Sequence, residues 1–146
     1  RFVMSAEPVQ VVGMSHDSGN WGIDTTFSGT MKFANGAIGN ITTNMEQPFR
    51  CYITVDGSKG RIEIPGMFDD SGPIIIKTGD GRNGEENQII STPAPYRFVV
   101  QFDEFSECIL SGKKPEYPAE DGLRNTAVVE ALHKSAETGS SVDLSL

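Results

Sequence analysis

The sequence has few of the residues on which most metal and redox sites depend. It contains two cysteines, Cys51 and Cys108, and two histidines, His16 and His133. Cys51 lies in a strand pattern and Cys108 in a helix pattern, placements more typical of buried thiols in a reducing compartment than of a disulfide. Neither histidine has a partner at the spacing of a metal site or a catalytic triad. We therefore predict surface roles for both histidines, no metal site and no catalytic residue in this chain.

Positive charge and long apolar runs are also scarce. The chain has 12 Lys and Arg residues against 20 Asp and Glu residues, a net charge of -8. A field of this sign repels phosphate backbones and anionic membranes, so nucleic acid is not an expected partner. No run approaches the roughly 18 apolar residues of a membrane span, and no basic and then apolar leader opens the chain. We expect a cytoplasmic protein with no membrane partner.

The 146 residues are enough for one domain with a single core. The chain opens on the apolar residues 1–4 without an initiator methionine. This opening resembles the end of a cut helix, because Pro8 disfavours helix at the residue before it. We therefore expect residues 1–146 to be one domain of a longer protein.

Strand patterns fill the first two thirds of the chain. Residues 51–55 and 61–64 alternate apolar and polar side chains around the Gly-rich turn 56–60, which predicts a hairpin. Residues 23–33 alternate in the same way up to Asn35 and Gly36, a tight-turn pair, and residues 37–45 are the expected return strand. Further short strand patterns cover residues 9–14, 73–78, 88–92 and 142–146.

Two helical patterns follow. Phe98, Phe102, Phe105 and Ile109 recur at helical spacing up to Gly112, and a second apolar stripe runs from Leu123 to Leu132 before Gly139. The predicted fold class is therefore α+β, an open and mostly antiparallel sheet of about six strands with two C-terminal helices packed on one face.

The other face of the expected sheet carries few charges. Its side chains are mostly small and polar, namely Thr26, Ser28, Thr30, Thr42, Asn44, Tyr52 and Thr54. Such a face is either a solvated antiparallel surface or one that packs against a second copy of the chain, and both readings stay open.

A literal G-x-G-x-x-G occurs at residues 79–84 after an apolar strand pattern. A dinucleotide site requires a helix to begin there, so that its N-terminal amides meet the pyrophosphate. Glu85 and Glu86 follow instead, with strand-like residues after them. We interpret the motif as a hairpin turn. Better candidates for ligand contact are Trp21, Phe49, Arg50 and Tyr96 near loop ends, although core packing or a surface ion pair would also explain each.

Several short sequence segments, taken in their order along the chain, resemble one protein family. They are FSGTMKFANGA at residues 27–37, VDGSKGRIEIP at 55–65, FDEF at 102–105, GKKP at 112–115, AEDGLR at 119–124 and ALHKSAETG at 131–139. Together they resemble the C-terminal domain of the glucose-fructose oxidoreductase / inositol dehydrogenase / MocA family. The resemblance covers nearly the whole chain.

The resemblance implies the substrate and oligomerisation domain of an NAD(P)-dependent oxidoreductase that acts on a sugar, polyol or related compound. NAD or NADP would be bound by an N-terminal dinucleotide domain outside this chain, so the fragment alone would be inactive. The family's open sheet implies a homodimer or larger oligomer. By position, Phe49, Arg50 and, less directly, Tyr96 would contact a sugar-like substrate. The alternative is a freestanding ligand-binding or dimerisation module without redox activity, while no residue grouping supports a hydrolase.

Overall fold

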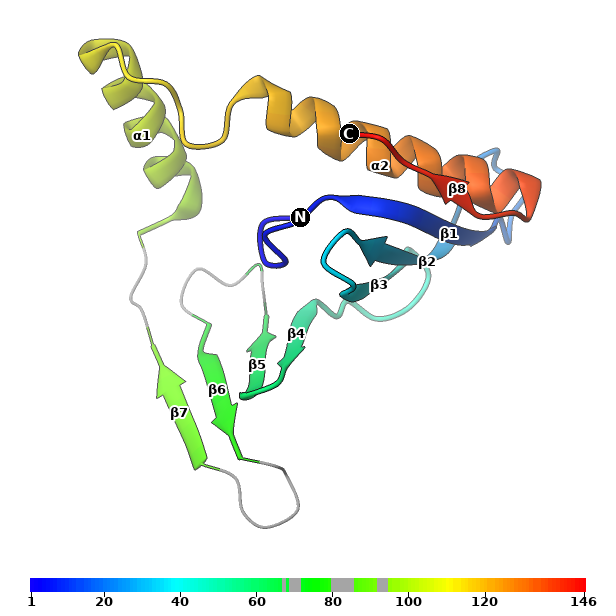
Figure 1. The fold of residues 1–146 in the computed structure, drawn as a ribbon, viewed down its shortest axis with the longest axis horizontal. Coiled ribbons are helices and arrows are strands. Elements are labelled where there is room, and N and C mark those ends of the chain that lie inside the picture. The colour runs from blue at the N-terminus through cyan, green and yellow to red at the C-terminus, as the bar shows by residue number, and fades with distance from the viewer. Residues whose placement is uncertain (67, 69–71, 80–85, 92–94) are drawn as a thin grey trace. The chain divides into compact units, whose positions relative to one another are not determined.

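A computed structural model describes residues 1–66, 68, 72–79, 86–91 and 95–146 of the chain. It divides into two compact units, the first formed by residues 1–47 and 116–146 and the second by residues 48–115. Each unit contains an antiparallel sheet of four strands (Figure 1). The predicted α+β class is confirmed, with two helices near the C-terminus. The strands are shared between two open sheets instead of one sheet of about six.

The first unit has the strand order β3-β2-β1-β8. Its elements are β1 (Pro8–His16), β2 (Thr26–Phe33), β3 (Ile38–Asn44), α2 (Ala119–Thr138) and β8 (Val142–Asp143). The predicted hairpin between β2 and β3 is present, with Lys32 opposite Ile38. Gly36 has a φ of +87° in this turn, a conformation that glycine adopts at no steric cost.

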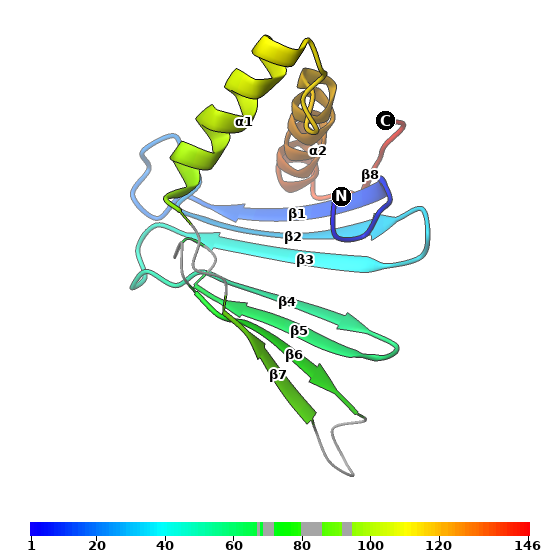
Figure 2. The same cartoon turned by 90° about the vertical axis from the view of Figure 1, so that its left-hand side faces the viewer.

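The core of the first unit lies where α2 crosses β1 and β2 (Figures 1 and 2). Gly13 and Gly29 make room for the helix, because a Cβ atom on either would lie within 2.7 Å of Leu132. The later part of the apolar stripe predicted for α2 therefore faces the sheet, whereas Leu123 at its start is 71 % exposed. The buried cluster consists of Val11, Phe27, Val128, Ala131 and Leu132.

The second unit has the strand order β4-β5-β6-β7. Its elements are β4 (Tyr52–Gly57), β5 (Gly60–Pro65), β6 (Ile74–Thr78), β7 (Glu86–Ile90) and α1 (Arg97–Ser111). The predicted β4–β5 hairpin is present, and its register pairs Tyr52 with Pro65 and Asp56 with Arg61. This hairpin positions the candidate site.

The two predicted helices are present, one in each unit. α2 belongs to the first unit and has buried residues, whereas α1 belongs to the second unit and has none. The predicted apolar stripe of α1 is exposed, with Phe102 at 67 % and Ile109 at 68 %. The helix ends as predicted at Gly112, which has a left-handed φ of +68°.

Two sequence features fall largely outside the described residues, namely the G-x-G-x-x-G motif after Gly79 and the acidic pair Asp69 and Asp70. Within the parts that the structure describes, neither helix combines the length and the apolar character that a membrane crossing requires.

Candidate functional site

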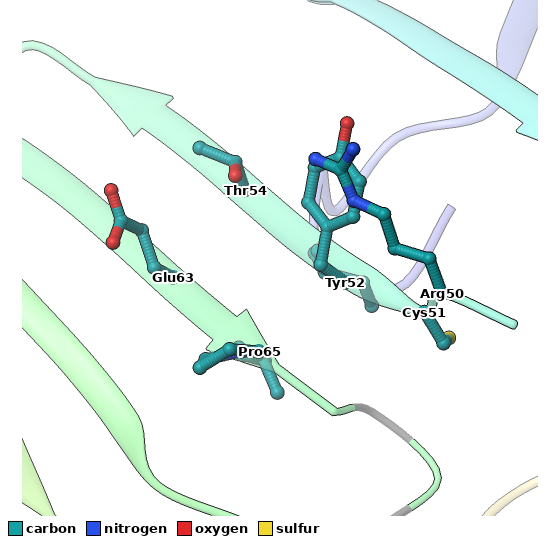
Figure 3. Close-up of a pocket in the computed structure, with 8 residues that line it drawn as sticks. Arg50, Cys51, Tyr52, Thr54, Glu63 and Pro65 are labelled. Carbon is teal, nitrogen blue, oxygen red and sulfur yellow. The ribbon is translucent and has the colours of Figure 1, made fainter. Parts of the chain in front are cut away.

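The candidate site is an open hollow of about 320 Å³ on the β4–β5 hairpin (Figure 3). Alternation along β4 places Tyr52 and Thr54 on one face, and the antiparallel register adds their partners Pro65 and Glu63 to it. The remaining lining residues are Arg50, Cys51, Ile53 and Ile64. One short hairpin therefore brings a guanidinium, an aromatic ring, a hydroxyl and a carboxylate to one place.

Arg50 lies over the ring of Tyr52. The centre of the guanidinium is 4.4 Å from the ring centroid, within the range of a cation–π contact (Figure 3). The two residues are two positions apart, so a strand-like backbone turns their side chains to the same side. Tyr52 is itself 56 % exposed, so the stacked pair is open to solvent.

Glu63 is the half-buried carboxylate of the hollow. One of its oxygens lies 3.2 Å from Lys77 Nζ and 3.7 Å from Arg61 Nη1. Arg61 is also bound at 2.6 Å to Asp56 on the paired strand. The charge of Glu63 is therefore balanced by two cations from β5 and β6, which leaves its remaining lone pairs able to accept hydrogen bonds from a ligand.

A second group of side chains in this unit is aromatic. Phe49 and Phe68 have ring centroids 6.4 Å apart, and Tyr96 and Phe98 meet edge to face at 5.3 Å. Arg97 connects the two pairs, since its guanidinium lies about 6 Å from the rings of Phe68, Tyr96 and Phe98 and donates a hydrogen bond to the carbonyl of Phe68.

The three residues predicted to contact a substrate are thus divided between two places. Arg50 lines the hollow. Phe49 and Tyr96 do not line it, and belong to the aromatic group around Arg97. Their contact with a substrate stays a prediction.

Sequence reasoning did not assign Tyr52, Thr54 and Glu63 to a site. The signal was present, because the turn at residues 56–60 sets the register that pairs Thr54 with Glu63. Alternation around that turn predicts that all three lie on the polar face of one hairpin, and the register confirms this placement. Alternation alone does not reveal that these side chains line a hollow, because the hollow also needs Arg50 and Pro65.

Other candidates from the sequence lie in the first unit. Trp21 is 65 % exposed on the loop that Asp17 organises by accepting hydrogen bonds from the N–H groups of Gly19, Trp21 and Gly22. These bonds, that of Trp21 foremost, lower the pKa of Asp17. His133 packs on the ring of Phe27 at 5.1 Å.

Across the described ranges, no group of three His, Cys, Asp or Glu residues is arranged to hold a metal ion. Both cysteines are free thiols and half-buried. The guanidinium, ring, hydroxyl and carboxylate of the hollow can bind a polar ligand through hydrogen bonds and ring stacking.

The chain is similar to a known protein family and to single known proteins. The family model GFO_IDH_MocA_C, described as "Oxidoreductase family, C-terminal alpha/beta domain", matches residues 3–144. The chain is 26 % identical over 140 residues to D-xylose 1-dehydrogenase (NADP(+)) 2 of Haloferax volcanii, a match that covers 94 % of this chain and 42 % of that protein.

Solved structures of oxidoreductases also match nearly the whole chain. Aldose-aldose oxidoreductase from Caulobacter crescentus, complexed with glycerol, matches with a TM-score of 0.83 and 28 % identity over 99 % of this chain and 43 % of its own. Levoglucosan dehydrogenase in complex with NADH and L-sorbose matches with a TM-score of 0.78 and 17 % identity, which shows a shared fold, over 95 % of this chain and 45 % of its own. The chain spans less than half the length of each of these relatives.

Proposed function

Because the chain belongs to the Gfo/Idh/MocA oxidoreductase family and matches its C-terminal alpha/beta domain, we propose that it is the substrate-binding and oligomerisation domain of an NAD(P)-dependent sugar or polyol oxidoreductase. The observation that carries this proposal is the hollow on the β4–β5 hairpin. A ring of Tyr52 type stacks on the C–H face of a sugar, while Thr54 and Glu63 offer hydrogen bonds to its hydroxyl groups. Relatives that include a xylose dehydrogenase and a glycerol complex support the same ligand class.

The nicotinamide cofactor would be held outside residues 1–146. A dinucleotide requires a glycine-rich turn that leads into a helix N-terminus. The segment before α1 contains no glycine between Ser91 and Tyr96, and α2 carries Glu120 and Asp121 in its first turn, which repel a pyrophosphate. The described residues therefore do not fit the cofactor. We expect the chain alone to transfer no hydride between NAD(P)H and a sugar, and turnover by this chain would contradict that division of roles.

The open face of the first sheet supports a role in oligomerisation. Its polar side chains bond across the strands, with Thr30 donating to Asn40 at 2.9 Å and Ser28 lying 3.3 Å from Thr42. Gln10 donates to Asp143 at 2.8 Å on the same sheet. Polar groups that already have partners lose fewer hydrogen bonds when water leaves. We infer that a second copy of the chain covers this face.

Sugar binding is tested by adding D-xylose or D-glucose to the chain and following backbone amide shifts by NMR. We expect shifts at residues 50–54 and 63–65 and none in α2. Thr54→Val removes a hydroxyl from the hollow and is expected to weaken binding, whereas Thr126→Val on α2 is the matched control and leaves it unchanged. Absence of shifts at saturating sugar, or shifts confined to the first unit, would refute the proposal.

A further inference from the structure

Arg50 differs from the arginines that form ion pairs in this structure. Arg1, Arg61 and Arg124 each lie within 4 Å of a carboxylate. Arg50 has no ion pair or hydrogen bond among the described residues, and its guanidinium lies over the ring of Tyr52. The chain has 20 acidic and 12 basic residues, so acidic partners outnumber the cations. A guanidinium left without one at the rim of a hollow is available to a ligand.

The Tyr52 ring also determines how Arg50 presents its donors. A guanidinium stacked on an aromatic face keeps its five N–H groups in the plane, directed outward past the edge of the ring. These donors form a rigid fork that matches a carboxylate or a phosphate in a two-point contact. Since the ring restricts the side chain before a ligand arrives, less rotamer entropy remains to be lost on binding.

Among the described residues that line the hollow and their ion-pair partners, cations outnumber carboxylates, although the chain as a whole is acidic. Glu63 is paired with Lys77 and Arg61, and Arg61 is also paired with Asp56. The charged side chains of the hollow and their ion-pair partners are three cations and two carboxylates, namely Arg50, Arg61 and Lys77 with Glu63 and Asp56. The net charge of the chain is -8. One excess positive charge among these side chains attracts an anion.

We propose that the hollow selects sugars that carry an anionic group, either a carboxylate or a phosphate ester, and that Arg50 binds this group. The inference rests on the proposed function and deepens it, because Tyr52, Thr54 and Glu63 would hold the sugar while Arg50 chooses between a charged and a neutral one. A charge-assisted two-point contact is stronger than the neutral hydrogen bond that a sugar hydroxyl would make to the same guanidinium.

The test compares three ligands that share one pyranose ring, namely D-glucose, D-glucuronate and D-glucose 6-phosphate, by calorimetric titration of the chain. We expect at least one charged sugar to bind about tenfold more tightly than D-glucose at low salt. The charged ligand that binds more tightly identifies the anionic group. The preference falls as salt is added, because ions screen an exposed pair.

Substitutions at the stacked pair assign the preference to its residues. Arg50→Gln is expected to abolish the preference for the charged sugar, while Arg50→Lys retains part of this preference as a point charge. Tyr52→Phe keeps the ring and the preference, whereas Tyr52→Leu loses both. Arg124→Gln, in the first unit, is the matched control and has no effect.

Three other results of these titrations would contradict the selectivity, the role of Arg50 or the proposed function. Equal affinity for the three sugars refutes the selectivity and leaves the proposed function standing. A preference that survives Arg50→Gln refutes the role of Arg50. If no sugar binds at any salt concentration, the proposed function fails and this inference fails with it. Arg50 is exposed, so the variants are expected to fold, which far-ultraviolet circular dichroism checks.

Discussion

The hydroxyl of Ser135 on α2 accepts a hydrogen bond from the backbone N–H of Gly13 on β1 across 2.9 Å. The same hydroxyl donates to the carbonyl of Ser140 at 2.7 Å, and Ser135 is fully buried. The short strand β8 pairs with β1 only at Gln10 and Val11. At Gly13, beyond the paired residues, the Ser135 hydroxyl accepts the hydrogen bond that a strand partner would otherwise accept. This bond connects α2 to the sheet.

Ser135→Ala is expected to destabilise the first unit by about 1–3 kcal/mol, because the N–H of Gly13 is left buried without an acceptor. Urea unfolding followed by the fluorescence of Trp21, the single tryptophan, measures the change in this unit. Ser111→Ala is the matched control, since Ser111 bonds within the exposed helix α1 and its loss leaves this transition unchanged. Equal stability of Ser135→Ala and the parent chain would contradict the assignment.

Gly13→Ala and Gly122→Ala are expected to act in opposite directions. A Cβ atom on Gly13 would lie 2.3 Å from the carbonyl oxygen of Leu132, so the helix must move away from the strand. We expect a loss of about 3 kcal/mol or more. Gly122 lies in α2 with nothing within 4 Å of such an atom, and alanine there should stabilise the helix by about 0.5–1 kcal/mol.

The comparison of unfolding midpoints checks both glycine substitutions in one experiment. A Gly13→Ala variant as stable as the parent chain would show that α2 does not approach β1 as closely as the structure has it. If Gly122→Ala stabilises the chain and Gly13→Ala has no effect, the helix-propensity argument for Gly122 still holds.

Acid should weaken the first unit through Glu7. The hydrogen bond that Arg1 donates to Glu7 holds the pKa of this carboxyl below its ordinary value of 4.5. A group whose pKa is lowered by folding binds more protons when unfolded, so its stabilising contribution is present above pH 4.5 and is lost as the pH falls through the folded pKa. The free energy of unfolding, measured in urea from about pH 6 to about pH 3, should therefore decrease.

Glu7→Gln should flatten this decrease, because the substituted side chain does not titrate. Glu130→Gln, on an exposed position of α2, keeps the Arg1 pair and should follow the parent chain. Asp17, whose pKa is lowered mainly by the N–H of Trp21, adds a decrease of the same sign to every variant. An unchanged pH profile for Glu7→Gln would contradict the role of the Arg1 pair.

The self-association proposed for the first sheet predicts a concentration-dependent change in sedimentation. Thr30→Arg places a charge in the middle of the open face and should shift the chain to monomer. Thr126→Arg, on the exposed side of α2, should sediment like the parent chain. Only monomer at high concentration of the parent chain would remove the proposal.

Local pattern was sufficient for most elements. The stripe from Leu123 to Leu132 predicted α2, and its buried members Val128, Ala131 and Leu132 face the sheet as expected. The turns at Gly36 and at residues 57–60 set the hairpin registers that the structure has. These features depend on neighbours in the chain, and periodicity records such neighbours directly.

The division of the strands between two sheets could not be predicted in this way. Whether β3 pairs with β4 is a non-local question, and the segment between them, with Pro48, predicted a break without saying whether the sheet resumes beyond it. The same holds for the aromatic group around Arg97, because the ring contacts that join Phe49 to Tyr96 through Phe68 and Arg97 connect positions far apart in the chain.

By itself, the amino-acid sequence determined the α+β class, the hairpins, the two helices and a family resemblance. Each of these follows from short-range periodicity, from turn chemistry or from short sequence segments in a fixed order. Only the tertiary structure decided that Val128, Ala131 and Leu132 of α2 are buried, that Ser135 completes β1 at Gly13, and that Arg50 has the Tyr52 ring beneath it and no acidic partner among the described residues. Those facts depend on which side chains meet after the chain has folded, and no local pattern encodes such distances.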